Sequence, residues 1–406
     1  MIVRRGSFRE HNATRVLAYT FARMQPSRIR LMLAIFALVV IAPCTRTNYA
    51  EDTPSRISVE KAVAFLMSKQ GKDGGWHSET YGSLRQGASL TAFSLYGISH
   101  VPEEVVAAYR KDIQRGFDFL RTGIDEKGHV ANPDGTSDYP SYASAMTLTA
   151  ARRLKIKLSE DDEQKLIDYL IGAQLGESRK FSPDNPHYGG WDMTGSQLVL
   201  GQTSGTNVSL GRFVIEALSA SDDAKAKAAV QLGRQWAHGC QNFPGDGGFF
   251  FVPEARFQSN KAQLMKDRED ESERRPRSYG TTTCDGVCCL LYAGASDMDE
   301  RVAAGVKWVV DRPTVDEVPG FEDLKPSTQW EKGLRYYYYA GLVKVLPYFP
   351  EEESAERSKN LTKKLLSDQR RDGSWKNESQ RMREDDPLIC TSLGLIAMAE
   401  LVNHAK

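Results

Sequence analysis

VAFLMSKQGKDGGW, at residues 63–76, is an apolar segment that ends in Gln70 and is followed, after three residues, by Gly-x-Trp. The same order returns near the other end of the chain as LLSDQRRDGSW, at residues 365–375. Four weaker versions lie between them, with their aromatic or histidine residue at positions 129, 191, 249 and 321. The turns recur every 53 to 72 residues, and such internal repetition predicts six structural units of one kind.

The residue types of this turn suit a reversal of the chain at the end of a helix. Glycine adopts the positive φ angles that stop a helix and turn the backbone. A tryptophan or phenylalanine supplies a large apolar anchor, and the glutamine is expected to tie the helix end to the next unit by hydrogen bonds. One unit cannot bury its own apolar face, so the units must stack.

Each unit is predicted to contain two helices. The first is amphipathic and ends at the turn, whereas the second is more apolar and rich in small residues. Apolar residues recur at helical spacing, and no segment alternates as a strand does. The second helices are predicted at residues 89–98, 141–154, 206–218, 281–293, 333–346 and 388–401. We therefore expect an all-α protein with little or no β structure, in which the second helices form an inner layer.

The spacing Gln-x-x-x-Gly-x-Trp resembles the QW repeat of the squalene–hopene and oxidosqualene cyclases, and a similar double ring of helices occurs in the β-subunits of protein prenyltransferases. The resemblance to this terpenoid cyclase and protein prenyltransferase superfamily extends from about residue 57 to residue 403. It implies an (α/α)6 toroid whose cavity lies at one mouth, near the N-terminal ends of the inner helices. The cyclases pair two such rings, whereas this chain has one.

The first fifty residues are typical of an export signal. Arg28 and Arg30 precede twelve apolar residues at positions 31–42, which are too few to cross a membrane but suit the core of a signal peptide. We therefore predict a signal peptide at 1–50, with Met24 as the true start, a single toroid domain at 51–406, and an exported protein of the periplasm or cell envelope. The alternative is a retained membrane anchor.

Charge gives no reason to expect a nucleic-acid partner. The first fifty residues hold eight of the 53 basic residues and one of the 53 acidic residues. Their removal leaves 45 basic and 52 acidic residues, a net charge of −7. A mildly acidic protein lacks the basic surface that nucleic acids require.

Cyclases of the resembling family protonate an isoprenoid with the central acid of an Asp-x-Asp-Asp motif, which must be held in a dry pocket. No Asp-x-Asp-Asp occurs in the sequence, and the nearest segment is Arg383-Glu-Asp-Asp386, at the entrance to the last inner helix. Asp385 and Asp386 are therefore candidate catalytic residues. The alternative is that they cap that helix ahead of Pro387.

Protein prenyltransferases hold a catalytic zinc ion with Asp, Cys and His. The segment Asp285-Gly-Val-Cys288 is similar to the Asp-Gly-Cys part of that site, but the inserted Val287 rotates the sulfur by about 100° on a helix. No histidine opens the last inner helix, where the third ligand belongs. We therefore predict no metal and no cofactor, and we expect the cysteines to be buried free thiols. Asp285 is a candidate catalytic residue, with the alternative of a charge at a helix N-terminus.

Aromatic rings suit an isoprenoid cavity because their π faces stabilise carbocations. Tyr142 opens the second inner helix, and residues 336–339 are four consecutive tyrosines on the fifth. Four successive side chains point around a whole helix, so only one or two can face the cavity. The candidate substrate-binding residues are Tyr142, Tyr336 and Tyr337. The charged insertion at about 257–278 is expected to be a solvated loop or short helix over one mouth of the ring.

The sequence thus predicts an exported protein that holds an apolar, isoprenoid-type or lipid-like ligand in a ring cavity, with terpenoid cyclase-like chemistry if it is an enzyme. The alternative is a non-catalytic exported binding or scaffold protein for a lipid, glycan or protein partner. The missing Asp-x-Asp-Asp motif and zinc ligands favour this alternative. The sequence leaves open a homodimer, which would restore the second wall of the paired cyclases, and peripheral contact with a membrane.

Overall fold

The computed structural model describes residues 53–136, 138–193, 206–253, 260–266, 269–270, 274–324 and 329–404. These residues belong to one compact unit that begins at Thr53. The predicted signal peptide at 1–50, with the proposed start at Met24, lies outside the described residues, as do parts of the charged insertion.

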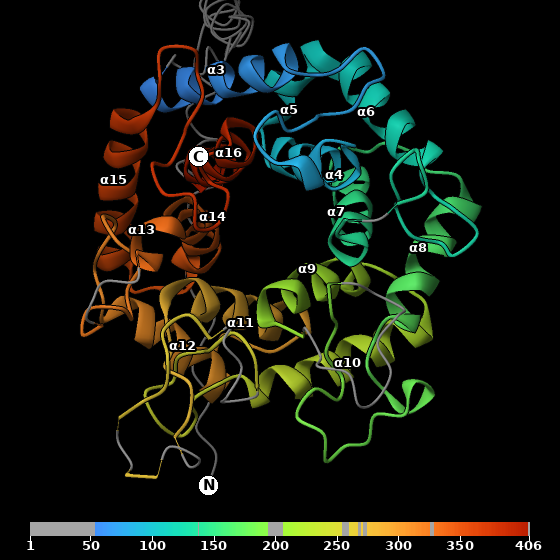
Figure 1. Cartoon of the computed structure of the whole chain (residues 1–406). Helices are drawn as coiled ribbons and strands as arrows, with labels where there is room; N and C mark the ends of the chain where they lie inside the picture. Colours follow the sequence, from blue (N-terminus) through green and yellow to red (C-terminus); the bar gives the residue numbers. More distant parts are fainter. Residues whose placement is uncertain are drawn as a thin grey trace, which may run out of the picture. The chain divides into compact units, whose positions relative to one another are not determined.

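Six helices form a closed inner ring around the centre of this unit (Figure 1). Each contacts the next in chain order, and the last returns to the first. They are α4 (Ala88–Ile98), α7 (Pro140–Arg153), α9 (Val208–Ser219), α11 (Gly280–Tyr292), α14 (Arg335–Val345) and α16 (Pro387–His404). Their bounds lie within three residues of the predicted second helices. The described residues contain isolated β-bridges but no strand, so the prediction of an all-α toroid is confirmed.

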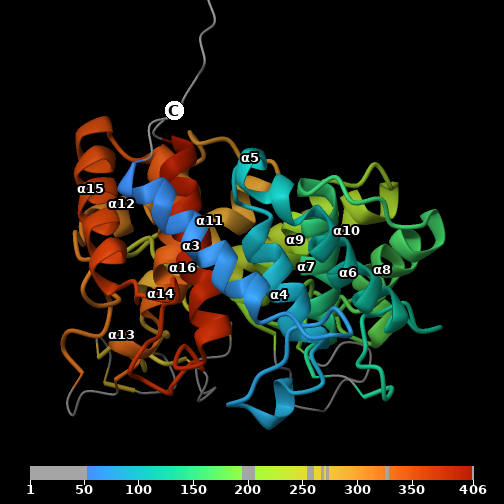
Figure 2. The same cartoon turned by 90° about the horizontal axis from the view of Figure 1, so that it is seen from above.

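Six further helices lie outside the ring (Figure 1). They are α3 (Pro54–Ser68), α6 (Arg110–Thr122), α8 (Glu160–Gly172), α10 (Ala224–Gly239), α12 (Glu300–Val310) and α15 (Glu351–Asp368), with the short α5 (Glu103–Val106) and α13 (Trp330–Gly333) in the connections. Each buries one face; in α6 that face includes Ile113, Phe117 and Leu120. The ring closes where α16 packs on α3 and α4, and α3 crosses in front of α16 in Figure 2.

Four glutamines join neighbouring units by the same pair of hydrogen bonds. Gln70 Nε2 donates to the carbonyl oxygen of Gly74 in its own turn and to that of Asp112 on the next outer helix, both at 2.8 Å. The corresponding bonds of Gln174, Gln241 and Gln369 are 2.8 or 2.9 Å long. The distant acceptor of Gln369 is Ser58 on α3, so the last helix pair is tied to the first.

Glycine and tryptophan complete these turns. The first glycine of each of the six turns has a positive φ, between 79° and 104°. A Cβ atom on Gly74 would lie 2.4 Å from the carbonyl oxygen of Arg115 on the next outer helix, so both conformation and space require glycine there. The indole Nε1 of Trp76 donates to the carbonyl oxygen of Leu66 at 2.7 Å. This carbonyl lies near the end of α3 and also accepts from the amide of Lys69 at 3.0 Å.

The second turn differs by one residue from the predicted position at His129. The backbone amide of Val130 donates to Ser144 Oγ at 3.1 Å, as the amide of Trp76 donates to Thr91 Oγ1 at 2.8 Å. Val130 therefore occupies the place of the tryptophan, and the prediction of His129 at that place is wrong. Val130 is 1% exposed and so fills this place by packing. Gly128, two residues earlier, has a positive φ, and a Cβ atom there would lie 2.6 Å from the carbonyl oxygen of Lys165.

The C-terminal ends of the inner helices converge on a buried cluster of charges. Glu216 on α9 is 2.7 Å from a guanidinium nitrogen of Arg153 and accepts a hydrogen bond from the Tyr96 hydroxyl at 2.8 Å. Burial alone would raise the pKa of Glu216, but the cations led by Lys344 and Arg153 lower it to about 2. Paired charged side chains therefore fill the centre of the ring at the C-terminal ends of the inner helices.

Helix α16 is the one described helix that is long and apolar enough to cross a membrane by length and composition alone. Of its apolar window, 72% is buried inside the ring. Its apolar character is therefore accounted for by its neighbours in the inner ring.

Candidate functional site

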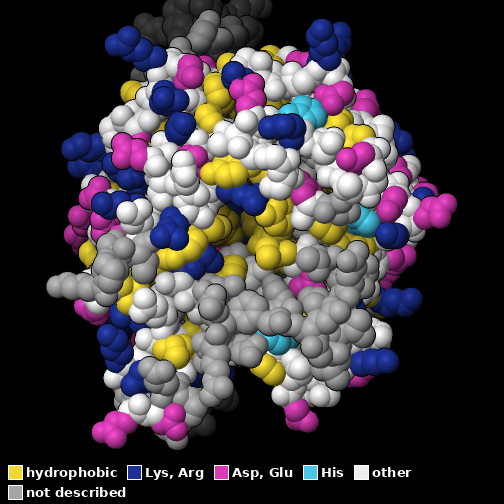
Figure 3. Space-filling view, in the orientation of Figure 1, with side chains coloured by type: hydrophobic (Ala, Val, Ile, Leu, Met, Phe, Trp, Pro, Cys, Tyr) yellow, Lys and Arg dark blue, Asp and Glu magenta, His cyan; other side chains and the backbone are white. Residues whose placement is uncertain are grey.

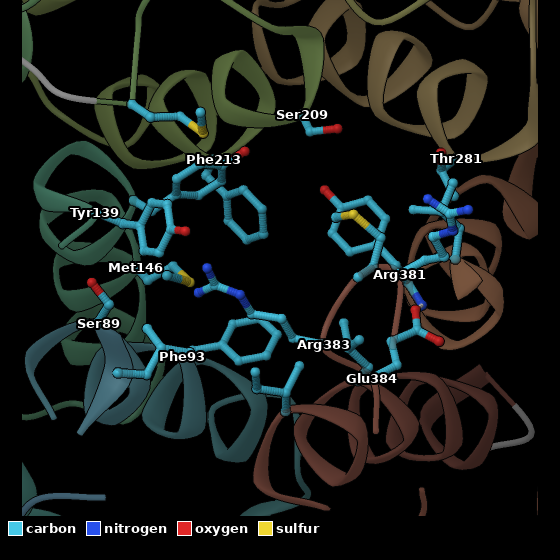
Figure 4. Close-up of a pocket in the computed structure, with 18 of the residues that line it drawn as sticks. Ser89, Phe93, Tyr139, Met146, Ser209, Phe213, Thr281, Arg381, Arg383 and Glu384 are labelled. Carbon is cyan, nitrogen blue, oxygen red and sulfur yellow. Dashed lines mark hydrogen bonds between the residues drawn. The ribbon is translucent and has the colours of Figure 1, made fainter. Parts of the chain in front are cut away.

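A cavity opens among the N-terminal ends of the inner helices, at the end of the ring opposite the buried charges. Its volume is about 390 Å³, which lies in the range of small-molecule sites. Figure 3 shows hydrophobic side chains around a hollow at the centre of this face, with Lys and Arg side chains beside it, and Figure 4 looks into the cavity. The inner helices contribute Ser89, Phe93, Tyr142, Met146, Ser209, Phe213, Thr281, Tyr337, Ile389 and Leu393.

Aromatic rings form much of the wall. Tyr142 and Phe213 meet edge to face with their ring centroids 5.5 Å apart, an arrangement that aromatic pairs favour. Behind them the Arg212 guanidinium carbon lies 3.6 Å from the centroid of Phe213. Such a wall binds ligands mainly through the apolar area that it removes from water, at about 25 cal/mol per Å².

The structure places the three candidate tyrosines differently. Tyr142 and Tyr337 line the cavity. Tyr336 is buried in the core, where its ring packs against that of Tyr339 at a centroid distance of 5.5 Å, and it is not among the lining residues. The side chains of neighbouring residues on a helix point about 100° apart. Tyr337 therefore faces the cavity, whereas Tyr336 faces the core.

Asp285 lies behind the wall of the cavity, with 1% of its surface exposed. Its Oδ2 accepts hydrogen bonds from the hydroxyls of Ser209, at 2.6 Å, and Tyr337, at 3.0 Å. Its Oδ1 is 3.0 Å from Nε of Arg212. Burial raises the pKa of Asp285, and the charge of Arg212 and the two hydroxyls oppose the rise. Asp285 stands in the second turn of α11, so its partner is Arg212 rather than the helix N-terminus.

Asp386 caps α16, and both Asp385 and Asp386 anchor the entrance of this helix. Asp386 accepts hydrogen bonds from the Ser78 hydroxyl at 2.5 Å and from the backbone amide of Leu388 at 2.8 Å. Asp385 accepts one from the Tyr81 hydroxyl. Neither is among the residues that line the cavity. Their hydrogen bonds with Ser78 and Tyr81 join the last inner helix to the loop after α3. The bond from Leu388 fits the capping alternative for Asp386 alone.

Glu384 is the lining carboxyl group that the sequence reasoning missed. Its oxygens accept hydrogen bonds from the backbone amides of Tyr336 and Tyr337, at 3.1 and 2.9 Å, and from Asn377 Nδ2 at 2.6 Å. Burial raises the pKa of Glu384 to about 7, although these donors oppose the rise. Glu384 is adjacent to Asp385 in the sequence, but nothing in the sequence around it indicates that its side chain faces the cavity.

Three cations also line the cavity and were not predicted: Lys261, Arg381 and Arg383. Lys261 Nζ lies 3.7 Å from the ring centroid of Phe251. Burial lowers the pKa of Lys261 to about 8. Lys261 belongs to the charged insertion, of which residues 260–266, 269–270 and 274–278 are described, and this part reaches the mouth of the ring.

Within the described ranges, no three His, Cys, Asp or Glu side chains are placed to hold a metal ion. All five described cysteines are buried and free, which confirms the prediction of buried thiols. Cys288, from the segment similar to a zinc site, therefore belongs to the packed core of α11.

No protein-family model and no curated protein matches this sequence, but solved structures do. The type II terpene cyclase MstE from Scytonema, in its apo form, has a TM-score of 0.54 at 13% identity, over 87% of this chain and 98% of that one. An MstE variant with its substrate geranylgeranyl dihydroxybenzoate gives 0.57 at 12%, over 86% and 98%. A sugar epimerase from a ruminal bacterium gives 0.55 at 11%, over 86% and 98%. Such low identities show the fold alone: the chain has a terpene cyclase-like, all-α ring.

Proposed function

We propose that this protein holds an apolar, isoprenoid-type molecule in the cavity at the mouth of its ring. The observation that carries the proposal is the lining, in which Phe93, Phe213 and Leu393 are among many apolar side chains. MstE, whose fold is similar, has a geranylgeranyl compound as its substrate. A branched hydrocarbon chain matches such walls because it gains affinity from apolar contact alone.

A sugar matches this lining less well, although a sugar epimerase has a similar ring. A polyol needs many free hydrogen-bonding groups around it. Three hydroxyls of the lining already donate their hydrogens into the wall. Tyr142 donates to Asn207 Oδ1 at 3.2 Å, and Ser209 and Tyr337 donate to Asp285. These groups offer a ligand only acceptor oxygens.

Terpenoid cyclase-like catalysis is a second candidate, and Glu384 favours it. It is the one carboxyl group of the described chain that lines the cavity. A pKa of about 7 leaves much of it protonated at neutral pH, as a proton donor requires. Its oxygens, however, already accept three hydrogen bonds from the wall, so the geometry supports ligand binding more directly than protonation.

Export remains a prediction from residues 1–50 and is part of the proposal. Sequencing the N-terminus of the protein from cell fractions tests it. A mature N-terminus near residue 50 in the periplasm or envelope supports export, whereas an intact N-terminus in the cytoplasm contradicts it.

Calorimetric titration of the purified protein with farnesol, geranylgeraniol and squalene tests the ligand class. Met146 lines the cavity, and Met298 is 84% exposed on the outside. Met146→Trp should fill the cavity and weaken binding at least tenfold, and the matched Met298→Trp variant should bind as the wild type does. Equal binding by both variants, or no binding of any of the three compounds by the wild type, would refute the proposal.

The same mixtures, analysed by mass spectrometry, test the second candidate. Cyclised product that disappears in Glu384→Gln, with ligand affinity retained, would establish catalysis. Binding without any product identifies the non-catalytic alternative.

A further inference from the structure

Two hydroxyl groups of the cavity wall, from different inner helices, share one buried carboxylate oxygen. Ser209 stands in the first turn of α9 and Tyr337 in the first turn of α14, and both helices pack on α11. Asp285, on α11, accepts from both hydroxyls with the same Oδ2, at 2.6 and 3.0 Å. The two hydroxyl oxygens therefore lie close together. Figure 4 shows Ser209 at the edge of the cavity, between Phe213 and Thr281.

The hydrogens of these two hydroxyls point away from the cavity. Arg212 Nε lies 3.0 Å from Asp285 Oδ1 and favours the charged carboxylate, which can only accept hydrogen bonds. Ser209 and Tyr337 therefore both donate to Asp285. Burial and the charge of Asp285 raise the pKa of Tyr337 well above its ordinary range, so the phenol keeps its hydrogen. A hydroxyl has one hydrogen and two lone pairs, so only lone pairs remain for a ligand.

A buried network behind the wall holds these oxygens in place. The Arg212 guanidinium carbon lies 3.6 Å from the ring centroid of Phe213. Its Nη1 donates to the Tyr96 hydroxyl at 3.0 Å and lies 3.4 Å from Glu216. Arg212, Tyr96 and Glu216 are all buried. Because Arg212 is fixed, Asp285 and the two hydroxyls that it orients are fixed as well, and acceptors positioned in advance lose little entropy when a ligand binds.

The charges around the cavity favour a neutral donor over a cationic one. Lys261, Arg381 and Arg383 line the cavity, and their charges repel an ammonium group. The charge of Asp285 does not offset this repulsion, because Arg212 is paired with it. An alcohol donates a hydrogen bond without bringing a charge into the cavity.

We propose that Ser209 and Tyr337 form an acceptor pair that binds the hydroxyl group of an apolar alcohol. The proposal rests on the proposed function and adds the polar group of the ligand and its place in the cavity. The ligand hydroxyl donates its hydrogen to one of the two oxygens, and the hydrocarbon part lies against Phe93, Met146 and Leu393. An analogue without the hydroxyl leaves the buried oxygens unpaired, so the site rejects it.

Three probes with the same farnesyl chain test this inference. Farnesol donates and accepts hydrogen bonds, farnesyl methyl ether only accepts them, and farnesene does neither. Each is titrated calorimetrically into the purified wild type, Ser209→Ala and Tyr337→Phe. Ser392→Ala and Tyr339→Phe are matched controls, because these inner-helix hydroxyls donate to main-chain carbonyl oxygens and do not line the cavity. Circular dichroism confirms that each variant is folded.

Farnesol should bind the wild type about tenfold or more tightly than the ether and farnesene, because it alone supplies a hydrogen to the buried oxygens. Ser209→Ala and Tyr337→Phe should each lower the affinity for farnesol about three- to tenfold and change the other two affinities by less than about twofold. This selective loss separates a binding role from a structural one, since a distorted cavity would weaken all three probes. Either variant suffices if the other does not fold.

Equal affinity of the wild type for farnesol and farnesyl methyl ether would overturn the acceptor pair and leave the proposed function standing. A preference for farnesol that persists in both cavity variants, or that the two control variants reduce as strongly, would overturn it as well. Failure of all three probes to bind would overturn the proposed function together with this inference.

Discussion

Replacement of Asp285 by alanine tests whether this buried carboxylate holds together the wall between the cavity and the charged end of the ring. In the folded chain Asp285 has an ion pair with Arg212 and two hydrogen bonds, from Ser209 and Tyr337. Alanine removes all three at once and leaves Arg212, which is 4% exposed, without its nearest carboxylate. The variant therefore creates a buried, partly uncompensated charge.

Removal of one partner of a buried ion pair costs about 3–5 kcal/mol of unfolding free energy. We expect about 3 kcal/mol, because Arg212 keeps Glu216 at 3.4 Å and the Tyr96 hydroxyl at 3.0 Å. Asp285→Asn should cost less, about 1.5–3 kcal/mol, since its side-chain oxygen still accepts from Ser209 and Tyr337.

Urea unfolding followed by circular dichroism measures these differences. Asp297→Ala, at an exposed position beyond the end of α11, is the matched control and should leave the midpoint unchanged. A loss below about 1 kcal/mol in Asp285→Ala, or product formation that disappears while unfolding is unchanged, would refute the structural role and favour a catalytic one.

The remaining predictions concern turns and pH. Gly74→Ala should lower the unfolding free energy by more than about 1 kcal/mol, because the φ of Gly74 is positive and the carbonyl oxygen of Arg115 is close. Gly82 has open space around it, so the control variant Gly82→Ala should leave the unfolding free energy unchanged. Equal unfolding midpoints for the two variants would contradict this. Trp375→Phe should cost about 0.5–1.5 kcal/mol through the lost indole hydrogen bond to Leu365; chemical denaturation measures it, and an unchanged unfolding free energy would contradict it. Burial lowers the pKa of His100 from 6.5 to about 3, so the unfolding free energy should fall as pH falls from 6.5 toward 3. In His100→Gln the unfolding free energy should depend less on pH between pH 6.5 and 5, and the same pH dependence as in the wild type would contradict this.

The helix pairs could be predicted because their signals are local. A glycine that ends one helix and a run of small apolar residues that begins the next are both read within a few positions, and α4 differs from its predicted start by one residue. The error at His129 has a physical cause. Val130 fills the anchor position by packing, and a valine gives no aromatic signal.

The cavity was harder to predict because its residues come together only in space. Asp285 was recognised as a buried-looking carboxylate, but its partner Arg212 lies on another inner helix. Lys261 and Arg383 come from connections, where charged residues are usually solvated. Nothing local distinguishes a loop arginine that points inward from one that points into water.

Closure of the ring also bears on how the chain folds. The hydrogen bond from Gln369 to Ser58 spans 311 residues, and the one from Ser78 to Asp386 spans 308. Bringing such distant segments together costs about 5 kcal/mol of chain entropy by the (3/2)RT ln n scaling, and no partial chain recovers it. Helix α16 covers both α4 and α14, so a chain cut before residue 387 would leave these two inner helices without that neighbour. We expect such a truncated chain to associate through the exposed apolar surfaces instead of closing into a smaller ring.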